Sequence, residues 1–495
     1  MIKRKILFIS IVVIIFSTGF FSLSSVSNGI NNDIPTSTLK TSFLDYTNAT
    51  VISDDGTNWN VGSSNNPAIV VGIDGKAHVV WQDSTDGLWG TDSEIMYASS
   101  IDGITWTNAT AISDDISLWN DDSSFNPDIA IDKNNQIHVV WYDYTDGAWG
   151  IDTEIMYTSS VDGITWTNAT IVSDDGTNWN NGSSIFAEIA VDITNQIHVV
   201  WEDETDGVWG IDVEIMYASN DGSGWTNATV ISDDGTNWND GYSNHPDIAV
   251  DKTGKINVVW SDNTDGAWGG DDEIMYSFNN GAGWSNVTII SDDGILWNDG
   301  ASYDPQLAID NEGTIHVVWD DYTDGAWGID TEIMYTSSVD GITWTNATIV
   351  SDDGTNWNNG LSIFAEIAVD TNEIVHVVWQ DYTDGVWGID TEIMYSLYNG
   401  TEWSNATVVS DGYNETYWND DSSFDSSIAV SKDGKAYIVW FDSTDGAWGT
   451  DTEIMYTSFS AFTPSSGGGI SFGYTFIFFM IIGVISIIGY TKKKL

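Results

Sequence analysis

Residues 137–143 read Ile-His-Val-Val-Trp-Tyr-Asp, an apolar run with the alternation of a β-strand. A fixed period of the Val-Val-Trp string inside this run indicates a repeat architecture, in which each unit buries its apolar surface against its neighbours. The string, which is Ile-Val-Trp in the last copy, returns every 59–61 residues and ends at Trp81, Trp141, Trp201, Trp260, Trp319, Trp379 and Trp440. Seven units therefore make up the body of the chain.

Each unit is expected to contain four antiparallel strands. In the second unit the pattern predicts strands at residues 127–132, 136–143, 154–159 and 164–173. Asp162-Gly163 is a hairpin dipeptide between the third and fourth strands. Two long loops, residues 144–153 and 174–184, follow the second and fourth strands and should lie on one face. This pattern predicts an all-β fold, a seven-bladed β-propeller of four-stranded antiparallel blades.

The tryptophan count predicts how the ring closes. Four tryptophans per unit would make 28, and the chain has 27. The missing one belongs to the fourth strand of the last unit, which the C-terminal part of the repeat does not contain. Residues 46–50 align with residues 106–110, so residues 46–53 should supply that strand and pair with the strand around Glu453 to Thr457. Such closure removes exposed sheet edges.

The ends of the chain predict export and a membrane anchor. The chain divides into a signal peptide at 1–27, a linker at 28–44, the propeller at 45–460, a Ser/Gly-rich tether at 461–469, a transmembrane helix at 470–490 and a cytoplasmic basic tail at 491–495. An uncleaved N-terminal anchor is the alternative for the first segment. The expected location is the cell membrane, single-pass, with the propeller outside. The lack of cysteine favours a bacterial or archaeal surface.

The composition excludes several partners and sites. Between residues 41 and 465 there are six lysines, no arginine and 73 acidic residues. Such a charge repels phosphate backbones, so no nucleic-acid partner is expected. The absence of cysteine excludes disulfides and thiolate metal sites. At 41% hydrophobic and 13% aromatic content the chain should nevertheless fold around a packed core.

Three hairpins carry a family resemblance. They read Ser100-x-Asp102-Gly103-x-Thr105-Trp106, Ser160-x-Asp162-Gly163-x-Thr165-Trp166 and Ser338-x-Asp340-Gly341-x-Thr343-Trp344. These hairpins resemble the Asp-box of sialidase-type (BNR-repeat) β-propellers, although each is one residue shorter than the family motif between Asp and Gly. The resemblance implies the fold, and it implies that the Asp-box is a structural hairpin away from any catalytic site. Sialidases grip the substrate carboxylate with three arginines, which this propeller lacks, and as a rule have six blades, so we expect no sialidase activity.

The long loops suggest calcium, because a hard cation is bound by carboxylate, amide and carbonyl oxygens near a glycine turn. The candidate ligands in the first three units are Asp83, Asp86, Asp92, Glu94, Asp143, Asp146, Asp152, Glu154, Asp203, Asp206, Asp212 and Glu214. The alternative is that Asp83 and its equivalents cap turns and bond backbone amides. The sequence requires no cofactor.

The same face should carry two tryptophans per blade as a candidate binding surface. They are Trp59, Trp89, Trp119, Trp149, Trp179, Trp209, Trp238, Trp268, Trp297, Trp327, Trp357, Trp387, Trp418 and Trp448. An extracellular glycan or protein is the expected partner besides the membrane.

A carboxylate pair on this face would suit a glycosidase. Against this, the loops are nearly the same in all blades: residues 143–192 and 321–370 differ only at Ser183 and Leu361. The least repeated loop, residues 411–420, is where an asymmetric site is expected.

Two further residue sets recur in the repeats. Candidate N-glycosylation sites of the pattern Asn-[Ala/Val]-Thr start at Asn48, Asn108, Asn168, Asn227, Asn286, Asn346 and Asn405. The alternative is that the blade covers this side of the strand. A histidine row on the second strands, His78, His138, His198, His316 and His376, becomes asparagine or tyrosine in the other units, which favours packing or hydrogen bonding over metal binding.

The function that these patterns predict is binding or scaffolding at the cell surface through an acidic, tryptophan-rich loop face. A carbohydrate-cleaving enzyme and a purely structural surface-layer component are the alternatives. We expect no catalysis.

Overall fold

The computed structural model describes residues 49–460 apart from short gaps. The gaps are residues 55–59, 88, 115–119, 121, 146–150, 175–179, 181, 208–209, 234–238, 240, 267–268, 293–297, 299, 324–328, 353–357, 359, 386–387, 412–418, 420 and 447–448. The predicted signal peptide, linker, tether, transmembrane helix and basic tail therefore lie outside the described residues. Within the described part, no helix has the length and apolarity to cross a bilayer.

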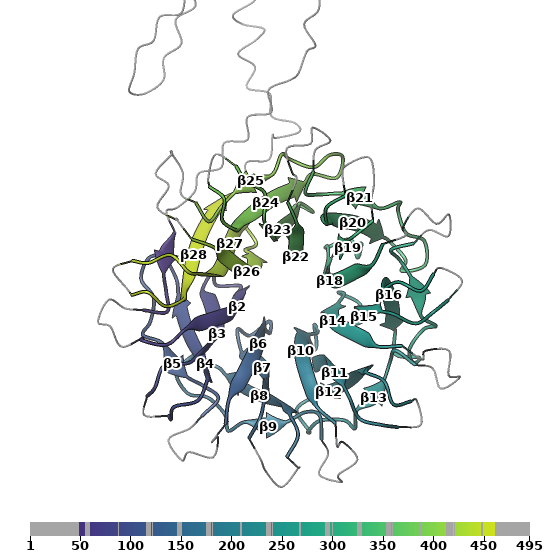
Figure 1. Ribbon diagram of the computed structural model, residues 1–495. Helices are drawn as coiled ribbons and strands as arrows, with labels where there is room; N and C mark the ends of the chain where they lie inside the picture. Colours follow the sequence, from purple (N-terminus) through teal and green to yellow (C-terminus); the bar gives the residue numbers. More distant parts are fainter. Residues whose placement is uncertain are drawn as a thin grey trace, which may run out of the picture. The chain divides into compact units, whose positions relative to one another are not determined.

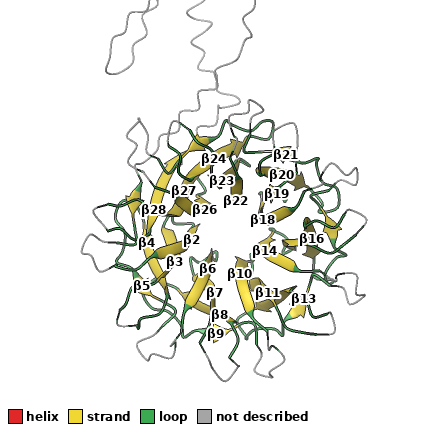
Figure 2. Cartoon of the chain, viewed as in Figure 1, coloured by secondary structure: helices red, strands yellow, loops and turns green. Residues whose placement is uncertain are grey.

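The described chain forms seven four-stranded antiparallel sheets, as predicted. They stand like blades around a central opening (Figure 1), and the described elements are strands and loops (Figure 2). The first strands line the opening and are β2 (Ser64–Val71), β6 (Ser124–Ile131), β10 (Ser184–Val191), β14 (Ser243–Val250), β18 (Ser302–Ile309), β22 (Ser362–Val369) and β26 (Ser423–Val430). The second strands are β3 (Ala77–Asp83), β7 (Ile137–Asp143), β11 (Ile197–Asp203), β15 (Ile256–Asp262), β19 (Ile315–Asp321), β23 (Val375–Asp381) and β27 (Lys435–Asp442).

The outer half of each blade is made by its third and fourth strands. The third strands are β4 (Glu94–Ser100), β8 (Glu154–Ser160), β12 (Glu214–Asn220), β16 (Glu273–Asn279), β20 (Glu332–Ser338), β24 (Glu392–Tyr398) and β28 (Glu453–Ser460). The fourth strands are β5 (Thr110–Ala111), β9 (Thr170–Ile171), β13 (Thr229–Val230), β17 (Thr288–Ile289), β21 (Thr348–Ile349), β25 (Thr407–Val408) and, for the last blade, β1 (Thr50–Val51).

The N-terminal strand closes the ring, as predicted. β1 pairs antiparallel with β28, with Thr50 opposite Tyr456. The Ile52 amide donates to the Ile454 carbonyl at 2.9 Å, and the Ser53 hydroxyl donates to the Glu453 carboxylate. Both ends of the described chain therefore meet in one blade.

The fourth strands are much shorter than the predicted run 164–173. In the second blade Trp166 bridges Ser160, and regular pairing resumes only where Thr170 faces Tyr157. Four steps along the outer chain thus match three steps along β8, which is a bulge. The bulge carries Asn168 outward and interrupts the ladder, so only Thr170–Ile171 remains as a strand.

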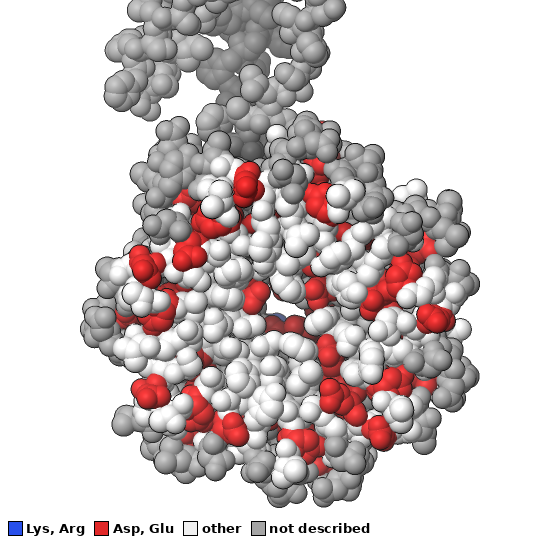
Figure 3. Space-filling model, viewed as in Figure 1, with Lys and Arg blue, Asp and Glu red and all other residues white. Residues whose placement is uncertain are grey.

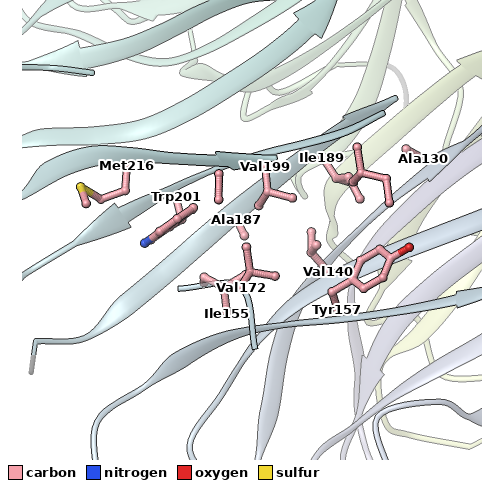
Figure 4. Packing of buried hydrophobic residues seen from close by; sticks show 12 residues of the cluster. Ala130, Val140, Ile155, Tyr157, Val172, Ala187, Ile189, Val199, Trp201 and Met216 are labelled. Carbon is pink, nitrogen blue, oxygen red and sulfur yellow. The ribbon is translucent and has the colours of Figure 1, made fainter. Parts of the chain in front are cut away.

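The apolar core lies between the blades. Trp201 of β11 is fully buried with Val199 and Met216, and the cluster continues into Ile155 and Tyr157 of the preceding blade (Figure 4). Equivalent clusters occupy the other blade interfaces. Replacing one such tryptophan with alanine removes a buried side chain whose loss costs about 3–5 kcal/mol. The repeated Val-Val-Trp string is therefore the part of the sequence that joins neighbouring blades.

The Asp-box is a structural hairpin here, as the resemblance implied. Asp162 accepts hydrogen bonds from the backbone amides of Ile164 (2.9 Å) and Thr165 (2.8 Å). Gly163 has φ of +70°, and a Cβ atom there would overlap the hydroxyl of Tyr97 in the preceding blade. Glycine at this position therefore lets the hairpin pack directly on its neighbour.

Candidate functional site: the central cavity

Two faces of the ring must be distinguished first. Ser64, which begins β2, pairs with Asp83, which ends β3, so both long loops of a blade leave at this end. We call this end the loop face, and the opposite end, where first and second strands join, the turn face. The structure agrees with the prediction that the long loops share one face.

Every first strand carries a bulge near the loop face. Its register shifts between the second and fifth residues. The third residue has a positive φ of 43–54° without being glycine, a conformation that side chains rarely adopt. These bulge residues are Asn66, Asn126, Phe186, His245, Asp304, Phe364 and Asp425. Strained positions of this kind concentrate at functional sites.

The bulges surround a cavity of ≈ 440 Å³ to which all seven first strands contribute. This volume lies within the ~300–1,000 Å³ of ordinary ligand pockets. Besides the bulge residues, the residue two positions further along the strand borders it in six blades: Ala68, Asp128, Glu188, Gln306, Glu366 and Ser427.

The cavity wall is one of the places where the repeats differ. The bulge position holds asparagine, phenylalanine, histidine or aspartate, whereas the strand ends around it are nearly constant. The sequence prediction placed the asymmetric site in the loop 411–420, most of which lies outside the described residues. It missed the bulge residues, His245 among them. A position-by-position comparison of the repeats would have found them.

Two aspartates, each the fifth residue of its first strand, connect neighbouring blades through hydrogen bonds. Asp128 accepts hydrogen bonds from the amides of Ile129 (2.7 Å) and of Ile189 in the next blade (2.9 Å). Asp247 accepts from Ile248 and Leu307 in the same way, each at 2.6 Å. The amides of Ile189 and Leu307 belong to the inner strands of the next blades, and the aspartates are their hydrogen-bond acceptors. Burial raises the pKa of Asp247 to about 7.

Two glutamates of the wall are held in a form that resists ionisation. Burial, and then the charge of Asp128, raises the pKa of Glu188 well above its usual range. Burial and the charge of Asp247 do the same for Glu366. A buried carboxyl among other carboxyls favours the neutral, hydrogen-bond-donating form. The wall therefore offers donors as well as acceptors at neutral pH.

His245 is the only basic side chain among the described residues that line the cavity. Its Nδ1 lies 2.9 Å from Asp304 Oδ1, and its backbone amide donates to Glu202 Oε1 at 2.6 Å. Burial lowers the pKa of His245, but the hydrogen bond to Asp304 and the neighbouring charges outweigh burial and raise it to about 9. His245 is therefore a cation at neutral pH, paired with Asp304.

Two phenylalanines add apolar surface to the cavity. Phe186 and Phe364 come from the duplicated blades, whose first strands β10 and β22 lie on opposite sides of the central opening (Figure 1). Phe364 is 43% exposed. The Phe186 ring lies 5.3 Å from the His245 ring, centroid to centroid. Aromatic faces on two sides of a polar opening suit a flat ligand with both apolar and hydroxyl-bearing surfaces.

The charges of the ring are separated between its two faces. All six lysines of the described residues lie in or next to the turns of the turn face: Lys76, Lys133, Lys252, Lys255, Lys432 and Lys435. Lys432 reaches the Ile73 carbonyl of the next blade at 3.0 Å. Acidic side chains surround the central opening, and basic atoms are visible only in its depth (Figure 3). The cavity therefore lies in a negative field.

The predicted calcium ligands have unequal surroundings. Asp83 is buried and accepts hydrogen bonds from Trp81 Nε1, Ser64 Oγ, Asn60 Nδ2 and the Thr85 amide, at 2.8–3.3 Å. Such saturation is the capping arrangement that the sequence offered as the alternative. Asp143 and Asp203 make the equivalent bonds.

The other predicted ligands divide by burial. Asp86 and Asp206 are exposed, Asp92, Asp152 and Asp212 are half-buried, and Glu94, Glu154 and Glu214 are buried. Asp146 lies outside the described residues. Calcium binding stays a prediction for the half-buried and buried residues.

The loop tryptophans lie almost entirely in the gaps. Trp89 alone of the fourteen is described: it is half-buried, and its Nε1 donates to the Thr85 carbonyl at 3.1 Å. Trp59, Trp119, Trp149, Trp179, Trp209, Trp238, Trp268, Trp297, Trp327, Trp357, Trp387, Trp418 and Trp448 lie outside the described residues. The tryptophan face stays a prediction.

The histidine row has a structural role. His138 Nδ1 lies 2.8 Å from the Tyr157 hydroxyl of the adjacent strand, and the other four histidines make the same contact. In the fourth blade Asn257 accepts from the Tyr276 hydroxyl at 2.7 Å. Burial lowers the pKa of His138 to about 4, so it is neutral. Hydrogen bonding within the blade, as predicted, accounts for the row.

The glycosylation motifs are accessible. Asn108, Asn168, Asn227, Asn286, Asn346 and Asn405 are all exposed, and Asn48 lies outside the described residues. Their exposure follows from the bulge before each fourth strand.

We expect the full chain from its native membrane to carry a glycan on these asparagines. Asn168→Gln should remove the mass of one glycan in intact-protein mass spectrometry. Asn311→Gln, at an exposed asparagine outside the motif, should remove none. An unmodified native chain would contradict the prediction.

Comparisons with known proteins agree on the fold alone. No protein-family model matches the chain, and no curated protein matches it. A polysaccharide lyase, the ulvan lyase of a new family, is 10% identical over 82% of this chain and 95% of that one, with a TM-score of 0.51. A protein of unknown function from Dyadobacter fermentans is 11% identical over 85% and 99%, with a TM-score of 0.47.

Sialidase-type structures are found as well. The intramolecular trans-sialidase from Ruminococcus gnavus is 12% identical over 84% of this chain and 99% of that one, with a TM-score of 0.41. At identities this low a likeness concerns the backbone and not the chemistry. The chain is a seven-bladed β-propeller, as its seven four-stranded sheets show.

Proposed function

We propose that the chain is a membrane-anchored, cell-surface binding protein whose central cavity holds a neutral or amine-bearing carbohydrate. The observation that carries this proposal is the bulge ring. It gathers Asn66 and Asn126, the Phe186 and Phe364 faces and the His245–Asp304 pair around one cavity. A single ligand needs an asymmetric site, and this ring provides one.

The chemistry of the wall suits a sugar. Sugar rings present C–H faces that pack on aromatic rings and hydroxyls that both donate and accept hydrogen bonds. Phe364 offers such a face, the asparagines and Asp304 offer acceptors, and neutral Glu188 and Glu366 offer donors. The predicted tryptophan-rich loops would enlarge the binding surface beyond the cavity.

The charge of the cavity selects against acidic glycans. The ulvan lyase structure has been determined with a glucuronate-containing sugar bound. Here the described lining residues include no lysine or arginine, and the single cation, His245, is already paired with Asp304. A uronate or sialate would find no unpaired cation among these lining residues and would lie in the negative field of the ring, which repels it. Neutral and amine-bearing sugars avoid this cost.

We further propose binding without turnover. Asp128 and Asp247 are occupied by two backbone amides each, which leaves them poorly placed to act as a base or nucleophile. The alternative, a glycoside hydrolase, would have to use Glu188 and Glu366, which come from equivalent positions of the duplicated blades. A purely structural component would bind no soluble glycan.

The test is glycan binding by the full chain purified in detergent, using neutral, amine-bearing and acidic oligosaccharides. Phe364→Ala should weaken binding of the preferred glycan about tenfold, since 1.4 kcal/mol corresponds to a factor of ten. Tyr382→Ala, which removes an equally exposed ring of the same blade outside the cavity wall (41% against 43%), should leave the affinity unchanged.

Three outcomes would contradict the proposal. One is strongest binding of acidic glycans, and another is equal loss of affinity in Phe364→Ala and Tyr382→Ala. The third is release of new reducing ends that Glu188→Gln abolishes, which would favour the hydrolase. Binding of no glycan would favour the structural role.

A further inference from the structure

Each blade buries a glutamate at the start of its third strand, on the loop face and away from the central cavity. At most 1% of each residue is exposed, and the seven are Glu94, Glu154, Glu214, Glu273, Glu332, Glu392 and Glu453. An aspartate stands two residues earlier in every blade, close enough for its charge to raise the pKa of the glutamate. Seven equivalent carboxylate pairs therefore surround the ring.

One oxygen of each glutamate is bound by the protein, and the other is not. Glu154 Oε2 accepts from Ser173 Oγ at 2.5 Å and from Asn180 Nδ2 at 3.4 Å. Glu154 Oε1 is buried and has no hydrogen-bond partner among the described residues, and the same holds for Oε1 of all seven glutamates. A buried oxygen of this kind costs free energy unless something else satisfies it.

The neighbouring aspartates repeat the pattern. Oδ2 is buried and lacks a partner among the described residues in Asp92, Asp152, Asp271, Asp330, Asp390 and Asp451. Asp174 of the same blade and Asp203 of the next blade lie near enough to Glu154 to add to the negative potential. Three other acidic side chains, Asp152, Asp174 and Asp203, thus add their charges to that of Glu154 at one blade interface.

No protein cation offsets this charge within the described residues. They contain no arginine, and their six lysines lie on the turn face, at the opposite end of the blades. His78, His138 and His198 are neutral, because burial lowers their pKa to about 4, and all five histidines of the row are bonded to tyrosine. An ion from solution is the remaining source of positive charge for a buried carboxylate pair.

We propose that each blade binds one hard divalent cation between the free oxygen of its buried glutamate and the carboxylate of the aspartate two residues earlier. No three acidic or histidine side chains of the described chain converge as a metal-binding group. The carboxylate pair would therefore share the ion with neutral oxygens or water, as Ca²⁺ and Mg²⁺ both accept. The site lies outside the cavity, so it stands independently of the carbohydrate proposal.

The location gives the ion a structural role. Asn180 links Glu154 of the second blade to Asp203 and Ser184 of the third. A cation at Glu154 would therefore neutralise charge on both sides of a blade interface. Seven such ions would stabilise the interfaces between the seven blades.

The experiment measures stoichiometry on the full chain after EDTA treatment, by calorimetric titration with Ca²⁺ and separately with Mg²⁺. Wild type should bind seven ions of the preferred metal per chain. Glu154→Gln should bind six, because glutamine keeps the shape and removes the ligand charge. Glu332→Gln, in the duplicate copy with the same contacts through Ser351 and Asn358, should also bind six. Asp206→Asn, at an exposed loop carboxylate, should still bind seven.

Thermal melts at fixed ionic strength provide the second measurement. With the preferred metal, Glu154→Gln should melt below wild type. In EDTA it should melt at or above wild type, because the variant no longer has the Glu154 carboxylate that lacks a cation. Absence of saturable binding, an unchanged stoichiometry in both glutamine variants, or equal stabilisation by sodium chloride would each overturn the proposal.

Discussion

Removal of residues 41–53 is expected to lower the melting temperature of the propeller sharply and to cause association. These residues include β1, which is the only partner of β28 on its outer side. Their loss removes the buried Ile52 side chain and leaves the Glu453 carboxylate without its serine donor. Truncating a buried side chain of this size alone costs about 2–5 kcal/mol. The bared edge of β28 would then be free to pair with another chain.

A matched pair of proline variants separates closure from local damage. Ile52→Pro removes the amide that donates to Ile454, and Ile112→Pro removes the equivalent donor to Ile95 within the first blade. Both substitutions cost one ladder hydrogen bond. Only Ile52→Pro weakens the pairing of β1 with β28 that closes the ring, so only this variant should form dimers or larger species in light scattering. Equal association of the two variants, or an unchanged melting temperature after the deletion, would contradict the closure role.

The sequence carried enough information for the blades because their determinants are local and repeated. The Val-Val-Trp string gave the period, and its tryptophans are the residues that fill the blade interfaces. Closure was predictable because residues 46–50 match the fourth strands of other units while the last unit lacks one. Both inferences rest on comparing copies within one chain.

The bulges in the first and fourth strands could not be predicted in this way. A left-handed conformation at Phe186 or Phe364 is imposed by neighbouring blades, since phenylalanine alone does not favour it. For the same reason the predicted strand 164–173 was too long: the extra residue before Thr170 shows only in the register. The bulge conformation and the length of the fourth strand thus depend on contacts between strands, which the pattern of a single strand does not predict.

The loop carboxylates show a different limit. Asp83 and Glu94 have similar sequence surroundings, yet four donors saturate Asp83 while Glu94 keeps a buried oxygen without a described partner. Composition predicts a cation for both. Only the hydrogen bonds distinguish a turn cap from a candidate ligand.

In EDTA, the stability of the propeller is expected to fall as the pH rises from about 6.5 to about 8. Burial raises the pKa of six of the repeated glutamates to about 8, and that of Glu392 to about 9, from an ordinary value of 4.5. Between those values the folded chain binds more protons than the unfolded chain. Stability must therefore decrease with rising pH, and most of this contribution is lost once the pH passes about 8.

The buried histidines change the stability in the opposite direction, but only below pH 6.5. Burial lowers the pKa of His78, His138 and His198 to about 4, so they stabilise the fold increasingly as the pH rises from about 4 to 6.5. Above 6.5 their contribution is complete, and the glutamates act without this opposing effect. At 1.36 kcal/mol per pKa unit, each glutamate accounts for at most about 2 kcal/mol between pH 6.5 and 8.

Urea unfolding at half-unit pH intervals, at fixed ionic strength in EDTA, measures this slope. Glu154→Gln should reduce it by less than one seventh, because glutamine does not titrate and the seven repeated glutamates share the effect with His245, Glu188 and Glu366, whose pKa values are also raised. Asp206→Asn should leave it unchanged, since that side chain is exposed. A free energy of unfolding that stays level or rises from pH 6.5 to 8 would contradict the prediction. If the same slope disappears when the preferred divalent cation is added, the ion has taken the place of the proton at the buried glutamates, and closure of the blade interfaces depends on either one.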